Sequence, residues 1–251
     1  MMSATIERHA LCAGLWAISG GMLWIESTRS LVAADVHLGY EEVIGGALPL
    51  WSTQPATKTL CDAAQALQAH EIVLLGDVIH GAHMSAGAAR RIGTALETLR
   101  KCARLELIAG NHEGRSRGEA VLGATHDVLE RAGWTLLHGD RATLTDAAVI
   151  GHLHPSVHLG GKESAPVFLG SRRLIVLPAL TPYSSGLDVR RDDCLDALAA
   201  WNVRPKDVDV VATLPSALFP LGKLSALRAD AAAVTRYAAR GYRRKFLRPD
   251  H

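Results

Sequence analysis

Apolar residues occur in short runs along the first two thirds of the chain, and several runs stop at a residue that can bind a metal ion. Four runs end in this way, at 31–34, 72–76, 105–110 and 147–150. Runs of this length are typical of buried strands. Open α/β sheets place their chemistry at the carboxyl ends of strands, so the pattern predicts that these four ends carry the functional groups.

The rest of the pattern predicts an α/β chain whose sheet has a parallel core. Gly20 and Gly21 separate two apolar arms, which indicates a β-hairpin over 15–25. Helices over about 56–70 and 85–101 alternate with the strands, as right-handed crossovers require. Further helices are predicted over 118–133, 195–201 and 226–245, and further strands over 134–137, 167–169, 174–177 and 208–213. The turn-rich region 45–55 is predicted to be a loop, in which Trp51 is either an anchor or a lid residue.

Composition fits a globular protein, because 48% of the 251 residues are hydrophobic and 21% are charged. No repeat or linker divides the chain, so we expect one domain over 1–251. The cysteines form no C-x-x-C pair, and we expect four reduced, mostly buried thiols in a cytoplasmic protein; they are Cys12, Cys61, Cys102 and Cys194. The apolar stretch 11–25 is short for a membrane span and is better explained by the hairpin.

Positive charge is concentrated at the end of the sequence. From Arg236 onward the chain carries six cations against Asp250, a net charge of +5, whereas the whole chain carries only +2. A basic tail of this kind, within the helix expected from about 226, can contact nucleic acid phosphates. A solvated helix end explains it equally well.

The residues at the strand ends form a set of oxygen and imidazole donors without a thiolate. This mixture suits hard to borderline divalent ions such as Mn, Fe, Zn or Co. Seven donors are too many for one tetrahedral zinc ion, but they suit two ions that share a carboxylate and keep open positions for water and substrate. The set consists of Asp35, His37, Asp77, Asn111, His138, His152 and His154.

These residues stand in blocks that resemble a known family. The blocks D-x-H, G-D-x-x-H, G-N-H-E, H-G and G-H-x-H follow one another between Asp35 and His154, as in the calcineurin-like metallophosphoesterases. The segments 34–39, 151–155, 177–179 and 186–189 look more specifically like the bacterial ligase-associated DNA-damage-response endonucleases. The resemblance implies a four-layer α-β-β-α sandwich of two mixed sheets flanked by helices, with a dimetal centre at one edge.

The same resemblance assigns a role to each donor. It implies that Asp35, His37 and His154 hold one ion. It implies that Asn111, His138 and His152 hold the second, and that Asp77 bridges both. A metal-bound hydroxide would attack phosphorus in line while the two ions, about 3.5–4 Å apart, neutralise the developing charge.

The resemblance places His112 beside the substrate phosphate, where it would protonate or stabilise the leaving oxygen. His80 is expected near the site or at the surface, without a defined role. Arg115 and Arg117 are either phosphate clamps or ordinary solvated arginines. Glu113 replaces the aspartate that is more frequent in the family, which puts the geometry around the ligands in question.

The family resemblance implies a Mn-dependent phosphodiesterase, specifically an endonuclease on single-stranded DNA in repair, with a DNA ligase or helicase as partner. Manganese is expected, with Zn, Fe or Co as other candidates. An alternative on the same centre is a phosphoesterase for a nucleotide or a phosphomonoester. A third reading is a scaffold without activity, but such a protein has no need of His112 or of open coordination positions.

Overall fold

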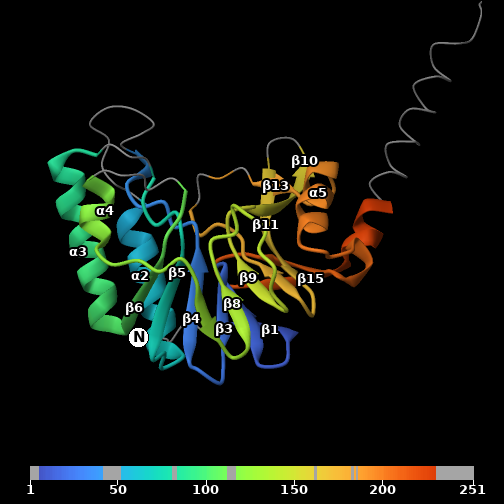
Figure 1. The fold of residues 1–251 in the computed structure, drawn as a ribbon, viewed down its shortest axis with the longest axis horizontal. Helices are drawn as coiled ribbons and strands as arrows, with labels where there is room; N and C mark the ends of the chain where they lie inside the picture. The colour runs from blue at the N-terminus through green and yellow to red at the C-terminus, as the bar shows by residue number, and fades with distance from the viewer. Residues whose placement is uncertain are drawn as a thin grey trace, which may run out of the picture.

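Two β-sheets face each other in the computed structural model, and helices cover the outer face of each sheet (Figure 1). The structure describes residues 6–41, 52–80, 84–111, 117–160, 163–181, 184 and 186–229. The layers follow the order helix, sheet, sheet, helix, so the expected α-β-β-α sandwich of two mixed sheets is confirmed.

In the described part of the chain the first sheet has six strands in sequence order. The predicted hairpin is confirmed, with Trp16 opposite Trp24 and Ala17 opposite Leu23. The last three strands run parallel, with Val32 beside Val73 and Val73 beside Glu106. The strands are β1 Arg8–Cys12, β2 Leu15–Ile18, β3 Met22–Ile25, β4 Ser30–Ala34, β5 Glu71–Leu75 and β6 Arg104–Ile108.

The second sheet has nine strands among the described residues and mixes both strand directions. Its central strands β8, β9 and β12 run parallel, which aligns their carboxyl ends. Its strands are β7 Leu129–Arg131, β8 Trp134–Leu136, β9 Ala148–Ile150, β10 Pro155–Gly160, β11 Glu163–Gly170, β12 Leu174–Val176, β13 Leu187–Asp188, β14 Asp209–Thr213 and β15 Leu218–Lys223.

Helices α2, Thr53–Ala66, and α3, Ala86–Cys102, cover the first sheet together with the short α4, Arg117–Leu122 (Figure 1). Helix α5, Asp192–Ala200, covers the second sheet and is followed by the 3₁₀ turn η1, Pro205–Asp207. Ser85 caps α3 by accepting a hydrogen bond from the backbone N–H of Ala88 at 3.1 Å.

Three apolar layers fill the spaces between these elements. Along β4, Leu31 and Ala33 face α2 and α3, whereas Val32 and Ala34 face the second sheet. This alternation follows from the two-residue period of a strand. A strand buried on both faces needs a continuous apolar run, which is the pattern that marks β4 and β5 in the sequence.

Two sequence expectations fail in this fold. The helix predicted over 118–133 ends at Leu122, and the chain continues into strand β7. Gly123, with a φ of +79°, lies directly after the helix, as expected of a residue that ends one. The expectation of four reduced cysteines is also wrong. Cys61 of α2 and Cys102 of α3 form a disulfide with a Cα–Cα distance of 5.6 Å, because the two helices pack side by side.

No helix among the described residues is long and apolar enough to cross a membrane. The helix expected from about 226 includes described residues, since 224–229 are helical. The basic residues of the tail, from Arg236 onward, lie outside the described residues. Trp51 and Glu113 also lie outside them.

Candidate metal centre

The seven predicted donors lie at the carboxyl ends of strands in both sheets. Asp35 and His37 follow β4, Asp77 follows β5, and Asn111 follows β6. His138 follows β8, and His152 and His154 follow β9. The sheets meet here, because Leu180 donates its backbone N–H to the carbonyl of Ala34 at 2.9 Å. Donors that are 119 residues apart in sequence, from 35 to 154, therefore reach one edge of the sandwich.

Backbone strain is concentrated at this edge. Nine residues other than glycine have positive φ in the described part of the chain, and five of them are predicted donors. Left-handed backbone is uncommon for such residues, and it persists where the surrounding fold imposes it, often at functional sites. The five donors are Asp35 (φ 52°), His37 (47°), Asp77 (44°), His152 (61°) and His154 (44°).

Three glycines lie so close to donor residues that a side chain would not fit at their positions. A Cβ on Gly110 would lie 2.1 Å from the backbone nitrogen of Asp77 and 2.3 Å from its Oδ1. A Cβ on Gly76 would lie 2.4 Å from Nδ1 of His138. A Cβ on Gly151 would lie 2.6 Å from Oδ2 of Asp35. The glycines beside the donors in the sequence blocks are thus required by the close approach of backbone to side chain.

Asp35, His37 and His154 form one group of potential ligands. One donor atom of each lies within 4.8 Å of the others. The carboxylate of Asp35 is fully buried and His37 is 4% exposed, whereas His154 is half-buried. Nε2 of His154 lies 3.2 Å from Oδ1 of Asp35, and its Nδ1 lies 2.6 Å from Oγ of Ser184. This arrangement directs Nε2 of His154 toward the carboxylate.

Asp77, His138 and His152 form the second group, with the same 4.8 Å limit. Nε2 of His138 lies 3.5 Å from Oδ2 of Asp77 and 3.1 Å from Nδ1 of His152. Oδ1 of Asn111 lies 2.9 Å from the same Nε2. The structure therefore places Asn111 beside the second group. The two groups are compatible with two metal ions.

The two groups are linked through Asp35. Its Oδ2 accepts the backbone N–H of His152 at 2.8 Å, so the carboxylate that belongs to the first group also fixes the backbone of the second. Its Oδ1 lies 3.8 Å from Nδ1 of His138. A loss of Asp35 would therefore disturb both groups.

Two observations test whether a cation fits this site. Oδ1 of Asp35 is buried and accepts no hydrogen bond among the described residues, which is costly for a carboxylate without a cation. His138 lies with Nδ1 3.0 Å from the carbonyl of Leu75, which can only accept. The proton of a neutral His138 then lies on Nδ1, and Nε2 offers its lone pair to the space shared with Oδ1 of Asn111. The lone pairs on Nε2 of His138 and Oδ1 of Asn111 repel each other unless a cation binds to both. The donors therefore fit a metal ion.

Electrostatics keep His152 available as a ligand. Burial and the neighbouring His138 lower the pKa of His152, although Asp35 and Asp77 act in the opposite direction. A lowered pKa favours the neutral imidazole, and only the neutral ring has a lone pair for a metal ion.

Two further side chains, His80 and Ser184, contact candidate ligands. Nδ1 of His80 lies 2.9 Å from Nδ1 of His37, and the ring of Tyr40 lies 4.5 Å from that of His80. His80 therefore contacts a candidate ligand, which settles its position beside the site. The G-D-x-x-H block already contained it. Ser184 was not anticipated, because a serine in a loop 30 residues after His154 carries no signal in a single sequence.

His112, expected beside the substrate phosphate, and Arg115 lie outside the described residues. Arg117 begins α4. His126 lies away from both groups, with its Nε2 3.0 Å from Oε2 of Glu106. His158, on β10, has an exposed side chain.

Two cavities open beside the first group. A cavity of about 140 Å³ is lined by His154 and by four hydroxyl side chains, Ser156, Ser164, Thr181 and Ser184. A larger cavity of about 500 Å³ shares Pro166, Ala179 and Thr181 with it and extends to the β2–β3 turn. None of the described residues that line the larger cavity is charged. The space beside His154 can therefore take an organic group larger than a phosphate.

The chain matches no protein-family model and no curated protein sequence. Among solved structures, its fold is similar to the crystal structure of nuclease MPE from Pseudomonas putida, with a TM-score of 0.65 and 20% sequence identity. The match covers 86% of this chain and 100% of that chain. At this level of identity the comparison shows the fold alone.

Proposed function

We propose that this chain is a dinuclear-metal-dependent phosphodiesterase that cuts nucleic acid, with single-stranded DNA as substrate and Mn²⁺ as the ion. The observation that carries the proposal is the pair of adjacent nitrogen and oxygen donor groups at one sheet edge. Two adjacent divalent ions are a recurrent solution for phosphodiester hydrolysis. The similarity to a solved nuclease supports the choice of nucleic acid.

In this proposal Asp35, His37 and His154 hold one ion, and His138, His152 and Asn111 hold the other. Asp77 reaches both. When bound, the ions supply charge neutralisation at the phosphoryl oxygens and activate water. His112 donates a proton to the leaving oxygen as the P–O bond breaks. The hydroxyl-lined cavity beside His154 accepts the part of the substrate next to the scissile phosphate.

The experiment compares three substrates with Mn, Mg, Zn and Co: circular single-stranded DNA, a small nitrophenyl phosphodiester and a nitrophenyl phosphomonoester. Cutting of the circle requires an internal nuclease, because a circle has no end. We expect cutting with Mn, and its loss in Asp77→Ala and His112→Ala. His70→Ala is the matched control, because this exposed histidine precedes β5 at the opposite end of the strand from Asp77.

A second candidate is a phosphoesterase for a small ester. The uncharged lining of the 500 Å³ cavity favours it, since a cavity for a polyanionic strand is commonly basic. Hydrolysis of the small esters by a protein that leaves the circle intact would support this candidate and reject the nuclease. If the protein hydrolysed none of the three substrates with any of the four metals, both candidate functions would be contradicted.

A place in DNA repair, beside a ligase or a helicase, rests on the family resemblance alone. The basic tail from Arg236 is the segment expected to add affinity for DNA. Removal of residues 236–251 should then weaken DNA binding and its salt dependence without changing hydrolysis of the small diester. Unchanged DNA binding after this truncation would reject the role of the tail.

A further inference from the structure

Another cavity, larger than the two beside the first donor group, lies at the end of the sandwich opposite to the metal centre. It has a volume of about 860 Å³. Arg172 and Arg173, which precede β12, line it, as does Trp134 at the start of β8. The metal ligands instead follow the ends of β8 and β9, which run parallel to β12. Arg173 and Leu177, on either side of β12, are four residue steps apart in extended chain, a span of about 13 Å.

The lining of this cavity has an excess of positive charge. Five cations and two carboxylates line it, which leaves a net charge of +3. Both carboxylates already have partners: Asp207 pairs with Arg204 at 2.8 Å, and Asp209 pairs with Lys223 at 2.8 Å.

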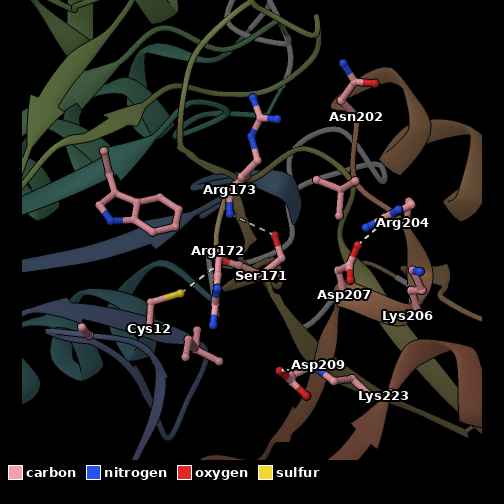
Figure 2. Close-up of a pocket in the computed structure, with 14 residues that line it drawn as sticks. Cys12, Ser171, Arg172, Arg173, Asn202, Arg204, Lys206, Asp207, Asp209 and Lys223 are labelled. Atoms are coloured by element: carbon pink, nitrogen blue, oxygen red, sulfur yellow. Dashed lines mark hydrogen bonds and ion pairs between the residues drawn. The ribbon is translucent and has the colours of Figure 1, made fainter.

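The other three cations, Arg172, Arg173 and Lys206, form no ion pair among the described residues. Arg173 donates Nε to the carbonyl of Asp146 at 3.3 Å, a contact that does not neutralise its charge. In Figure 2, Cys12, Arg172 and Ser171 lie on one side of the cavity, and Asp207 and Lys206 lie on the other. Cations that line one cavity without carboxylate partners are suited to bind a multiply charged anion.

The cavity also has an apolar wall, formed by Leu11, Ala13, Trp134 and Val203. Trp134 is 9% exposed and Val203 is 7% exposed, so the packed core holds both in place. A cavity with an apolar wall and a cationic rim matches a ligand with a flat ring at one end and several anionic oxygens at the other. Cavities of about 300–1,000 Å³ are typical of sites for molecules of this size.

We propose that this cavity is a binding site for a nucleoside diphosphate or triphosphate, separate from the metal centre. The phosphates contact Arg172, Arg173 and Lys206, and the base packs against the wall that contains Trp134. The site requires no divalent ion, since its own cations balance the phosphates. It does not depend on the proposed phosphodiesterase activity.

The test is calorimetric titration of the full chain with ADP, in EDTA so that the metal centre contributes nothing. We expect ADP to bind to wild type, and at least about tenfold more weakly to the Arg172→Ala/Lys206→Ala double variant. Both side chains are exposed, so their loss should leave thermal unfolding unchanged. The matched control is Arg91→Ala/Lys101→Ala, which removes two exposed cations from α3 and should bind ADP as wild type does.

Two further ligands test the two sides of the cavity. Pyrophosphate and adenosine should each bind more weakly than ADP, and only pyrophosphate should be sensitive to the double variant. An oligothymidylate that binds in place of ADP, and is lost in the double variant, would mean that the cavity takes a nucleic acid strand, and it would overturn the nucleotide proposal. Absence of ADP binding, or equal binding by wild type and double variant, would also overturn it.

Cys12 reports whether the ligand occupies this cavity. Its thiol lines the cavity and donates to the carbonyl of Ser171 at 3.1 Å, whereas Cys194 is buried elsewhere. Saturating ADP should slow alkylation of Cys12, measured by peptide mass spectrometry, without altering the small amount of labelling at Cys194. If ADP binds but leaves the rate at Cys12 unchanged, the nucleotide binds at another place and the assignment is wrong.

Discussion

Buried carboxylates occur at both ends of the first sheet, and their surroundings differ. Glu71, at the start of β5, lies 2.5 Å from Nε of Arg131 and also pairs with Arg104. Oγ of Ser30 lies 2.5 Å from Oε1 of the same carboxylate. Asp35, after the end of the neighbouring β4, faces imidazoles and has one oxygen without a hydrogen bond.

This difference distinguishes a structural carboxylate from a candidate metal ligand. At Glu71 the chain supplies its own permanent cations, so the negative charge is compensated on folding. At Asp35 the nearby groups are imidazoles, which are neutral when they act as ligands, and compensation requires a cation from solution. Burial alone does not separate the two cases, because Glu71 is 2% exposed and Asp35 is fully buried.

The largest expected effect is that of Asp77→Asn, because the proposal places this carboxylate on both ions. Hydrolysis should fall by roughly 10³-fold or more, a loss of about 4 kcal/mol of transition-state stabilisation. Both ions should be lost, as measured by elemental analysis after gel filtration. Asp35→Asn should lower the metal content less than Asp77→Asn does.

Glu71→Gln is the matched control on the same strand. It should retain both ions and wild-type hydrolysis, because it removes a carboxylate from the opposite end of β5. Metal loss in Glu71→Gln, or full metal content in Asp77→Asn, would contradict the distinction between a structural carboxylate at one end of the sheet and candidate ligands at the other.

Gly110→Ala should act on the metal centre through packing alone. Its new Cβ would overlap the backbone and carboxylate of Asp77, so Asp77 must move. We expect metal affinity to fall roughly 10- to 100-fold, as for other changes that misplace a ligand. Gly93→Ala is the control: a Cβ there meets no atom within 4 Å, and alanine should stabilise α3 by about 0.5–1 kcal/mol. Unchanged metal affinity in Gly110→Ala would contradict the close approach.

Acid should weaken the end of the sheet that contains Glu71. Burial alone would raise the pKa of Glu71, but hydrogen bonds from Arg131, Ser30 and Arg104 outweigh it and lower the pKa to about 2. The pKa is lower in the folded protein than the value of about 4.3 in the unfolded chain. The contribution to the free energy of unfolding, about 2–3 kcal/mol, is therefore present above about pH 4.5 and is lost as the pH falls toward 2.

Urea unfolding at pH 6 and pH 3 measures this contribution. Wild type should be more stable than Glu71→Gln at pH 6, and the difference should shrink at pH 3. A difference that stays constant between the two pH values would mean that Glu71 does not carry the effect.

The sequence predicted the parallel core and the positions of the donors because both depend on local patterns. β4 and β5 stand out as apolar runs, and each donor lies within four residues of the end of a strand. The region after Leu122 was wrongly predicted to be helical. Leu129–Arg131 is too short to show the alternation of apolar and polar residues that indicates a strand, and it becomes a strand only by pairing with β8. The Cys61–Cys102 disulfide depends on the packing of α2 against α3, which no spacing in the chain encodes.

The glycines show how far a sequence block can be interpreted. Gly76, Gly110 and Gly151 were visible as members of the blocks, but the atoms that exclude a Cβ belong to other strands. Glycine is required at these positions only because the folded sheet edge brings those atoms close to the backbone. The basic cavity lies further beyond prediction, because Arg172, before β12, and Lys206, in η1, line one cavity only in the folded chain.

The smallest expected effect is that of Ser184→Ala, which tests the support of a single ligand. Oγ of Ser184 lies 2.6 Å from Nδ1 of His154, and this contact orients Nε2 toward Asp35. Its loss frees the imidazole to rotate, so we expect affinity for one ion to fall about tenfold while the other stays bound. Stepwise metal titration with Co²⁺, followed by its absorption spectrum, separates the two ions. If both steps weaken equally, Ser184 supports the whole edge, and the division into two donor groups fails at this residue.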